Sequence, residues 1–377
     1  MNPARPPDPG PENPGPVPRP EAGFLNDWSG RLVQTWWRAE PLPLLKPLGA
    51  AYSWGAALRR RLFAAFGSAE RAARPVISLG NLTVGGSGKT SLALTLAGLL
   101  LARGYRPAVL SRGYGRRKRP GRSREPLIVS RGQGPLVDPA ESGDEPWLMA
   151  AELPAVRVVV AADRRPAART AVAGLGADIL ILDDGFQYLP LAADCRILLA
   201  PARRPFGNGA VLPAGPLRES LAAHHLAQVL VSTGGPEPAP ELKALAGERP
   251  VFAADYHPKG WRRLGSGRLH PPETLAGRRV LAFCGLGRPE TFARSLAALG
   301  LDIRQFLALA DHQQYDRRLL ADLGLAFVKS GADFLVTTAK DAVKLPADWP
   351  WPALVLQTEL RLADTEGFLQ AVLKACS

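Results

Sequence analysis

Short apolar runs alternate with stretches of helical spacing along most of this chain. Runs of three to six residues, of the kind that forms buried strands, lie at 76–79, 108–110, 127–130, 156–161, 179–182, 196–199, 229–232, 280–284, 306–309 and 334–338. Helical segments are expected after several of them, at 89–100, 147–153, 163–174, 289–299 and 317–330. This alternation predicts an α/β protein whose mostly parallel sheet carries helices on both faces, with a second, smaller α/β unit near the C-terminus.

Shifts in composition divide the chain further. Residues 1–22 form a proline-rich tail that is expected to be disordered, and residues 23–70 an amphipathic, membrane-associating segment. The larger α/β domain is expected at 71–250 and the smaller one at 280–377. Weak, irregular extended segments between them suggest a linker at 251–279.

The N-terminal segment is rich in tryptophan and leucine and ends in three arginines. Half of the eight tryptophans lie in it, and the apolar part runs from Leu42 to Gly67 with a break at Lys46 and Pro47. No run of 18 or more apolar residues exists, so no transmembrane helix is expected. Aromatic side chains beside terminal arginines favour a helix lying in the membrane interface. A helix packed on the protein's own core is the alternative.

The strongest local pattern is a glycine-rich turn between the strand at 76–79 and the helix that opens at Lys89 and Thr90. Strand, glycine loop and Gly-Lys-Thr form a phosphate-binding loop, in which backbone N–H groups and a helix N-terminus surround phosphate oxygens. Lys89 would reach the β- and γ-phosphates of ATP, and the Thr90 hydroxyl would ligate Mg²⁺. Thr83 stands where the usual motif has its first glycine. The alternative to a phosphate-binding loop is an ordinary strand-to-helix turn. The expected nucleotide-binding residues are Thr83, Val84, Gly85, Gly86, Ser87, Gly88, Lys89 and Thr90.

A second strand ends in two carboxylates. The run at 179–182 leads directly into Asp183 and Asp184, the expected position for aspartates that hold Mg²⁺ directly or through water. Thr90, Asp183 and Asp184 are therefore the expected metal ligands. The loop from Ser111 to Arg116 also follows a strand, so it should lie beside the phosphates.

Charge and cysteine content narrow the function classes. The net charge is +13, and residues 101–131 alone contribute +9, which suggests an anionic partner, although a solvated arginine-rich loop would show the same charge. Only Tyr105 and Tyr114 could stack on bases there, so nucleic acid is not an expected partner. Three scattered cysteines exclude a disulfide framework and indicate a reducing, cytosolic setting. No protein partner is predicted.

Eight motifs together resemble the tetraacyldisaccharide 4'-kinases of lipid A synthesis, over about residues 30 to 375. In chain order they are SLGNLTVGGSGKT, LSRGYGR, GDEP, LDDGFQY, FGNGAVLPAGPLRE, FCGLGRPETF, ADHQQY and TTAKDAVKL. The resemblance implies transfer of the ATP γ-phosphoryl group to the 4'-hydroxyl of an acylated glucosamine disaccharide 1-phosphate. It also implies a peripheral location at the cytoplasmic face of the bacterial inner membrane, whose anionic surface would be a second partner.

The resemblance also implies residue roles. Asp144 of GDEP would act with His312 of ADHQQY to activate the sugar hydroxyl, with Lys89 as the third catalytic residue. Without the resemblance, Asp144 would serve as a helix cap and His312 as a structural histidine. Because these groups lie on different domains, closure between the domains is expected. The residues matching substrate-lining motifs are Asn81, Tyr114, Arg116, Arg218 and Glu219.

Three positions depart from the family pattern. Tyr188 and Gln313 stand where the family has histidines, and Ala339 stands where it has a glutamate, so the roles of Tyr188 and Ala339 are open. The competing interpretation of the whole chain is a P-loop NTPase switch or metallochaperone with no small-molecule acceptor. Such proteins typically carry cysteine or histidine clusters, and this sequence has none.

Overall fold

The computed structural model describes residues 36–37, 40–117, 125–311 and 313–377. The expected tail at 1–22, His312 and the centre of the basic segment lie outside the described residues. The strands are β1 Val76–Asn81, β2 Pro107–Ser111, β3 Leu127–Arg131, β4 Arg157–Val160, β5 Ile179–Leu182, β6 Cys195–Pro201, β7 Val229–Thr233, β8 Val251–Arg263, β9 Leu269–His270, β10 Arg279–Cys284, β11 Asp302–Ala308, β12 Phe334–Thr338 and β13 Ala353–Leu362. The helices are α2 Lys46–Phe66, α3 Lys89–Ala102, α4 Pro139–Ser142, α5 Asp144–Glu152, α6 Arg164–Arg169, α7 Pro240–Ala246, α8 Pro289–Ala298, α9 Arg317–Ser330, α10 Ala339–Ala342 and α11 Thr365–Cys376. Shorter helical turns are η2 Pro43–Leu45, η3 Thr170–Gly174, η4 Leu221–Leu226 and η5 Pro272–Leu275.

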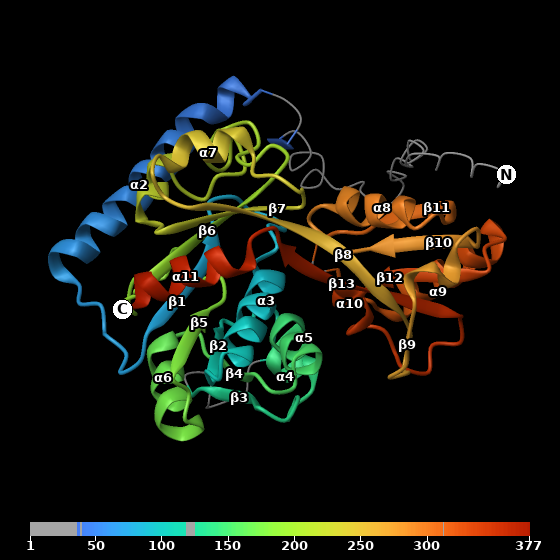
Figure 1. Ribbon diagram of the computed structural model, residues 1–377. Coiled ribbons are helices and arrows are strands. Elements are labelled where there is room, and N and C mark those ends of the chain that lie inside the picture. Colours follow the sequence, from blue (N-terminus) through green and yellow to red (C-terminus); the bar gives the residue numbers. More distant parts are fainter. Residues whose placement is uncertain (1–35, 38–39, 118–124, 312) are drawn as a thin grey trace, which may run out of the picture.

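One sheet runs through two lobes of the molecule (Figure 1). Its strand order is β11-β10-β12-β13-β8-β7-β6-β1-β5-β2-β4-β3, with β9 paired to β8. The pairs β3–β4, β8–β9 and β8–β13 are antiparallel and the others are parallel. The expected mostly parallel α/β fold is confirmed.

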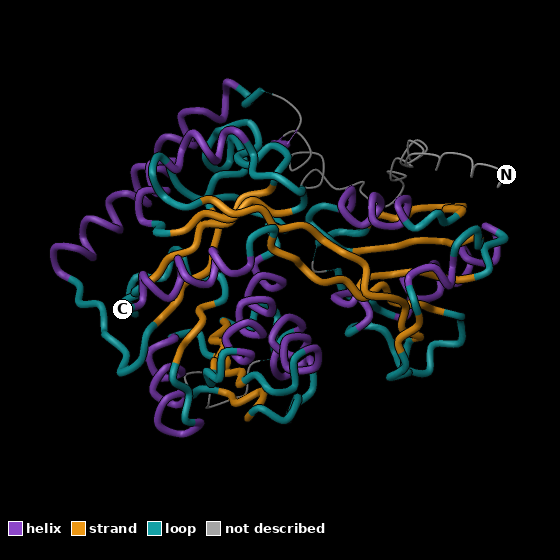
Figure 2. Tube along the Cα trace, in the orientation of Figure 1, coloured by secondary structure: helices purple, strands orange, loops and turns teal. Residues whose placement is uncertain are grey.

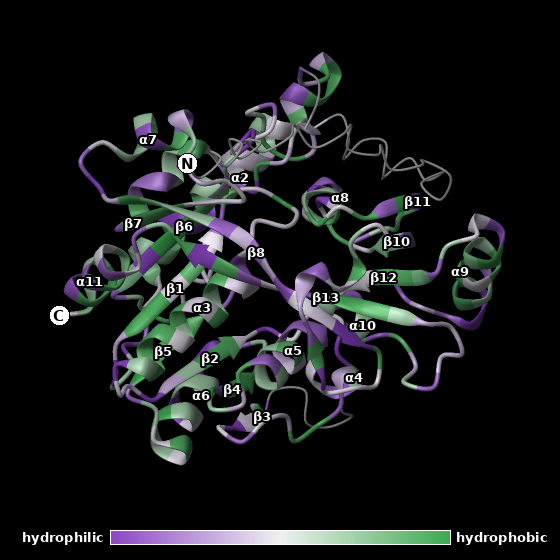
Figure 3. Ribbon diagram, turned by 45° about the vertical axis from the view of Figure 1, so that its right-hand side comes forward, coloured by the Kyte–Doolittle hydropathy of each residue, from purple (hydrophilic) through white to green (hydrophobic). Residues whose placement is uncertain are grey.

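Alternate side chains of the central strands pack on opposite faces of the larger lobe. In β1, Ile77 and Leu79 join the core beneath α3, α5 and α11, whereas Val76 joins the core beneath α6. The strand ribbons of this lobe are accordingly hydrophobic (Figure 3). Helices therefore cover both faces, as the apolar runs predict for strands buried on both sides.

The segment expected to be a linker, 251–279, is built differently. It begins with β8, a 13-residue strand whose first residues, Val251 to Ala254, pair with β7 of the larger lobe. Along its length β8 also pairs with β13, from Ala254–Leu362 to Arg263–Leu354. The two lobes thus share one sheet instead of being joined by irregular chain (Figure 2).

The last element also departs from the expected division at residue 280. Helix α11 packs against the larger lobe, where Phe368, Leu369 and Val372 are buried in the same core as Ile77 of β1. The ring of Phe368 meets that of Phe252 edge-on, with 5.5 Å between their centroids. The C-terminal segment therefore contributes to the core of the larger lobe.

We expect Phe368→Ala to lower the free energy of unfolding by about 3–5 kcal/mol, because it opens a cavity in a fully buried core. Urea denaturation measures this loss. The control Gln370→Ala alters the same helix at an exposed position and should cost only a few tenths of a kcal/mol. Equal stability of the two variants would contradict the assignment of α11 to this core.

Helix α2 lies on the outside of the larger lobe, and Gly49 is its one buried residue. Its exposed large side chains are Leu48, Tyr52, Trp54, Leu62 and Phe66, and Leu44 of η2 precedes them. In the described part of the chain, none of the helices combines the length and apolar character needed to cross a bilayer.

Candidate active site

The loop between β1 and α3 requires glycine at two positions. Gly85 and Gly88 have φ angles of 94° and 81°, which side chains with a Cβ rarely adopt. A Cβ on Gly88 would also lie 2.5 Å from the Tyr256 hydroxyl, so this position accepts only glycine without rearrangement. Gly88 is the glycine that directly precedes Lys89 in the motif, whereas Gly85 lies two residues after Thr83, which stands where the usual motif has its first glycine.

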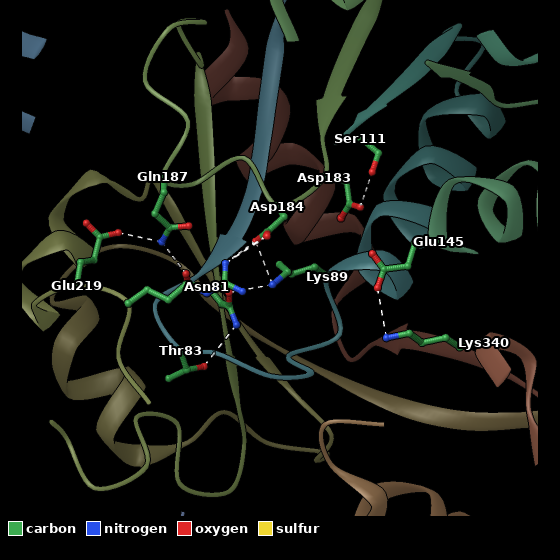
Figure 4. Close-up of polar contacts among 11 residues, drawn as sticks. Asn81, Thr83, Lys89, Ser111, Glu145, Asp183, Asp184, Gln187, Glu219 and Lys340 are labelled. Carbon is green, nitrogen blue, oxygen red and sulfur yellow. Dashed lines mark hydrogen bonds and ion pairs between the residues drawn. The ribbon is translucent and has the colours of Figure 1, made fainter. Parts of the chain in front are cut away.

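Lys89 is fixed at the centre of a polar network (Figure 4). Its Nζ donates to Asn81 Oδ1 at 3.0 Å and pairs with Asp184 Oδ1 at 3.0 Å. Arg218 Nη1 binds the same Asp184 carboxylate at 3.1 and 3.2 Å. Burial would raise the pKa of Asp184, but Lys89 and Arg218 outweigh it and lower the pKa to about 2. Asp184 therefore remains an anion that holds both cations in place.

Asp183 has the opposite environment. It is buried, its Oδ2 accepts a long hydrogen bond of 3.5 Å from Ser111 Oγ, and its Oδ1 has no hydrogen-bond partner. Burial, together with the Glu145 and Asp184 carboxylates, raises its pKa to about 7. A buried carboxylate oxygen without a partner, next to a phosphate-binding loop, fits a ligand for a divalent cation.

The remaining donors also suit magnesium. Among the residues described, no three histidine, cysteine or acidic side chains come together as a metal cluster. Magnesium needs no such cluster, because it is usually held by one or two carboxylates with nucleotide phosphates and water. Thr90 is the second residue of α3 and directly follows Lys89, whose Nζ pairs with Asp184.

The second lobe reaches the loop and the start of α5. A Cβ on Gly287 would lie 2.8 Å from the backbone N of Gly86, so the turn after β10 packs directly on the phosphate-binding loop. On the other side, Lys344 Nζ lies 3.5 Å from Asp144 Oδ2. Asp144 is the first residue of α5 and does not cap it, because Gly143 occupies the N-cap. The structure therefore holds the two lobes together around the loop.

The expected acceptor-binding residues fall into two groups. Asn81, Arg218 and Glu219 belong to the polar network: Gln187 Nε2 donates to the Asn81 carbonyl and to Glu219 Oε1, both at 2.9 Å. Tyr114 and Arg116 lie on the loop after β2, which touches α5, since a Cβ on Gly143 would lie 3.0 Å from the Tyr114 carbonyl oxygen. Tyr114 is exposed.

Tyr188, which replaces a family histidine, has a structural role. Its hydroxyl donates to Asp163 Oδ1 at 2.5 Å and accepts from the Arg164 backbone N–H at 3.0 Å. The Arg164 guanidinium lies 4.5 Å from the centre of its ring. Burial lowers the pKa of Arg164, whose charge acts on both Asp183 and Asp184.

Sequence reasoning missed several members of the site. They are Glu145, Arg164, Gln187, Lys340 and Lys344. All except Arg164 lie within motifs already singled out, GDEP, LDDGFQY and TTAKDAVKL, so the motifs marked the segments without indicating which side chains meet.

Comparison with known proteins identifies the family. The family described as tetraacyldisaccharide-1-P 4'-kinase matches residues 42–377. The tetraacyldisaccharide 4'-kinase of Syntrophus aciditrophicus is 41% identical over 316 residues, covering 79% of this chain and 83% of that protein. That of Geobacter sulfurreducens is 43% identical over 277 residues, covering 73% and 75%. A crystal structure of LpxK from Aquifex aeolicus, described as an "apo" form in complex with ATP, matches with a TM-score of 0.70 and 32% identity, covering 88% of this chain and 98% of that one.

The raised pKa of Asp183 predicts a pH dependence of stability without nucleotide or metal. The folded protein keeps this proton up to about pH 7, whereas the unfolded chain releases it near its ordinary value of 3.8. Because the folded state binds more protons in between, this carboxyl makes stability fall as the pH rises through that interval. Asp183→Asn should therefore gain stability relative to wild type at pH 7.5 but not at pH 4.5, as measured by thermal unfolding. A difference between the two proteins that is the same at both pH values would refute this.

Proposed function

This chain belongs to the tetraacyldisaccharide 4'-kinase family, and from that premise we propose how its residues divide the transfer of phosphate from ATP to the 4'-hydroxyl of the acylated disaccharide 1-phosphate. The proposal rests on the position of Lys89, which directly follows the glycine loop and whose Nζ is held between Asn81 and Asp184. A cation held rigidly there can stabilise the charge that spreads over the transferred phosphoryl oxygens.

We assign the triphosphate to the loop from Thr83 to Thr90. The N-terminus of α3 and the backbone N–H groups of a loop rich in glycine favour bound phosphate. Thr90 and Asp183 are the proposed Mg²⁺ ligands, with Asp184 beside them as the counter-ion of Lys89 and Arg218. A magnesium ion held by these residues would supply positive charge that neutralises part of the charge on the phosphates.

Asp144 is the proposed acceptor of the proton from the sugar hydroxyl. It lies at the N-terminus of α5, with 28% of its side chain exposed, so a substrate can reach it. The pairing with His312 stays a prediction, since that residue lies outside the described structure. Tyr114 and Arg116, whose loop touches the start of α5, are proposed to line the acceptor site, together with Asn81, Arg218 and Glu219.

We propose that α2 brings the enzyme to the anionic cytoplasmic face of the inner membrane. The large apolar side chains that α2 exposes suit the membrane interface. An enzyme with an acylated acceptor gains from such a position, because the acceptor's chains remain in the bilayer.

Lys89→Ala should lower the rate of phosphoryl transfer by about 100-fold or more, since it removes the cation that faces the phosphates. The assay follows labelled phosphate from Mg-ATP onto tetraacyldisaccharide 1-phosphate in detergent micelles. Wild-type protein that hydrolyses ATP without labelling the lipid would favour the NTPase switch. Undiminished transfer by the Lys89→Ala variant would overturn the role given to this lysine.

Vesicle binding tests the role of α2. The double variant Leu62→Glu and Phe66→Glu should bind vesicles containing phosphatidylglycerol about 10-fold more weakly than wild type, because two apolar contacts with the membrane are lost. The matched control places the same charges on exposed apolar positions of α9, in Leu325→Glu and Val328→Glu. Equal loss in both variants would show that added negative charge, and not α2, accounts for the change.

A further inference from the structure

Two lysines of the second lobe reach the two acidic residues that open α5. Lys340 Nζ lies 3.5 Å from Glu145 Oε1 and 3.1 Å from Asp311 Oδ1. Lys344 Nζ lies 3.5 Å from Asp144 Oδ2 and donates to the Gln313 carbonyl at 3.3 Å. Each lysine therefore joins α5 of the larger lobe to the loop that follows β11 in the second lobe.

Both lysines are held in place by their surroundings. Helix α10 is capped by Thr338, and the helical turn continues beyond it, with the Lys344 backbone N–H donating to the Asp341 carbonyl. The four-residue spacing puts both side chains on one side of this turn. Asp341 is fully buried and anchors the turn, accepting from the Gly285 backbone N–H at 3.0 Å and from Thr338 Oγ1 at 2.7 Å.

Lys344 is the more deeply placed of the two. Its side chain is only 8% exposed, against 19% for Lys340, and its Nζ lies over the Tyr315 ring, 5.7 Å from the ring centre. A buried lysine is stable as a cation only beside compensating negative charge. The Asp144 carboxylate, 3.5 Å from Nζ, supplies such a charge.

The geometry points to Lys344 as a positioning residue for phosphoryl transfer: it fixes the Asp144 carboxylate from the opposite lobe, while Lys340 fixes the neighbouring Glu145. This inference rests on the proposed role of Asp144. A carboxylate at a helix start is free to rotate unless a partner holds it, and a displacement of about 1 Å of a reacting group can cost about 100-fold in rate. Correct placement of Asp144 therefore requires the second lobe.

The critical substitution is Lys344→Met, which keeps an unbranched side chain of similar length and removes the charge. We expect kcat for lipid phosphorylation to fall about 10- to 100-fold, with the KM for ATP and the melting temperature close to wild type. Lys344→Arg returns a cation to the same place and should recover part of the loss. The control Lys329→Met removes an exposed lysine of α9 and should leave kcat unchanged.

A double-mutant cycle with Asp144→Asn decides whether Lys344 acts through Asp144. If it does, Lys344→Met adds no further loss in the Asp144→Asn background. An additive loss, or full activity of Lys344→Met alone, would overturn the inference. Full activity of Asp144→Asn alone would instead overturn the proposed proton acceptor and this inference with it, so the two failures are distinguishable. Should Lys344→Met fail to fold, Lys344→Gln makes the same comparison.

Discussion

Charge balance at the carboxyl ends of β1 and β5 is the constraint on which the site depends. Asp183 and Asp184 are consecutive, yet one is buried without a cation in contact and the other is bound by Lys89 and Arg218. Two adjacent carboxylates in a poorly hydrated site cannot both ionise at low cost, so their pKa values separate in opposite directions. Asp184 is therefore a permanent anion that orients the phosphate-binding lysine. Asp183 is a second carboxyl whose ionised form a bound cation would stabilise.

The continuous sheet explains how groups from two lobes can serve one site. Strands β8 and β13 belong to both lobes, and their antiparallel pairing fixes how the second lobe is oriented on the first. The turn after β10 can therefore press on the phosphate-binding loop, and α10 can face α5, without a separate interface. If residues 251–279 formed an irregular linker, no strand pairing would fix the orientation of the two lobes that these contacts require.

The sequence predicts the individual elements well and their assembly less well. Apolar runs such as 179–182 and the glycine loop before Lys89 have local causes, so they appear in the structure at nearly the expected residues. Strand β8 was missed because Pro258 and Gly260 are typical of strand ends, whereas here they flank a register shift opposite Gln357 and Thr358. Irregular pairing of this kind depends on the partner strand, which local pattern does not contain.

The same contrast between local pattern and long-range assembly applies to the site. Lys89, Asp183 and Asp184 could be predicted because each follows a strand in a known pattern of spacing. The pairs Lys344–Asp144 and Lys340–Glu145 could not, because about 200 residues separate the partners and only the shared sheet brings them together. Their residue types gave no signal either, since lysines beside an aspartate are common on exposed helices.

The proposed membrane helix and the phosphate-binding loop are two ends of one polar chain. Arg60 of α2 binds Glu219 Oε2 at 2.7 Å, Gln187 joins Glu219 Oε1 to the Asn81 carbonyl, and the Asn81 side chain binds Lys89. Glu219 is nearly buried, so losing Arg60 would leave its charge poorly compensated. Helix α2 is therefore connected to the site through this series of polar contacts.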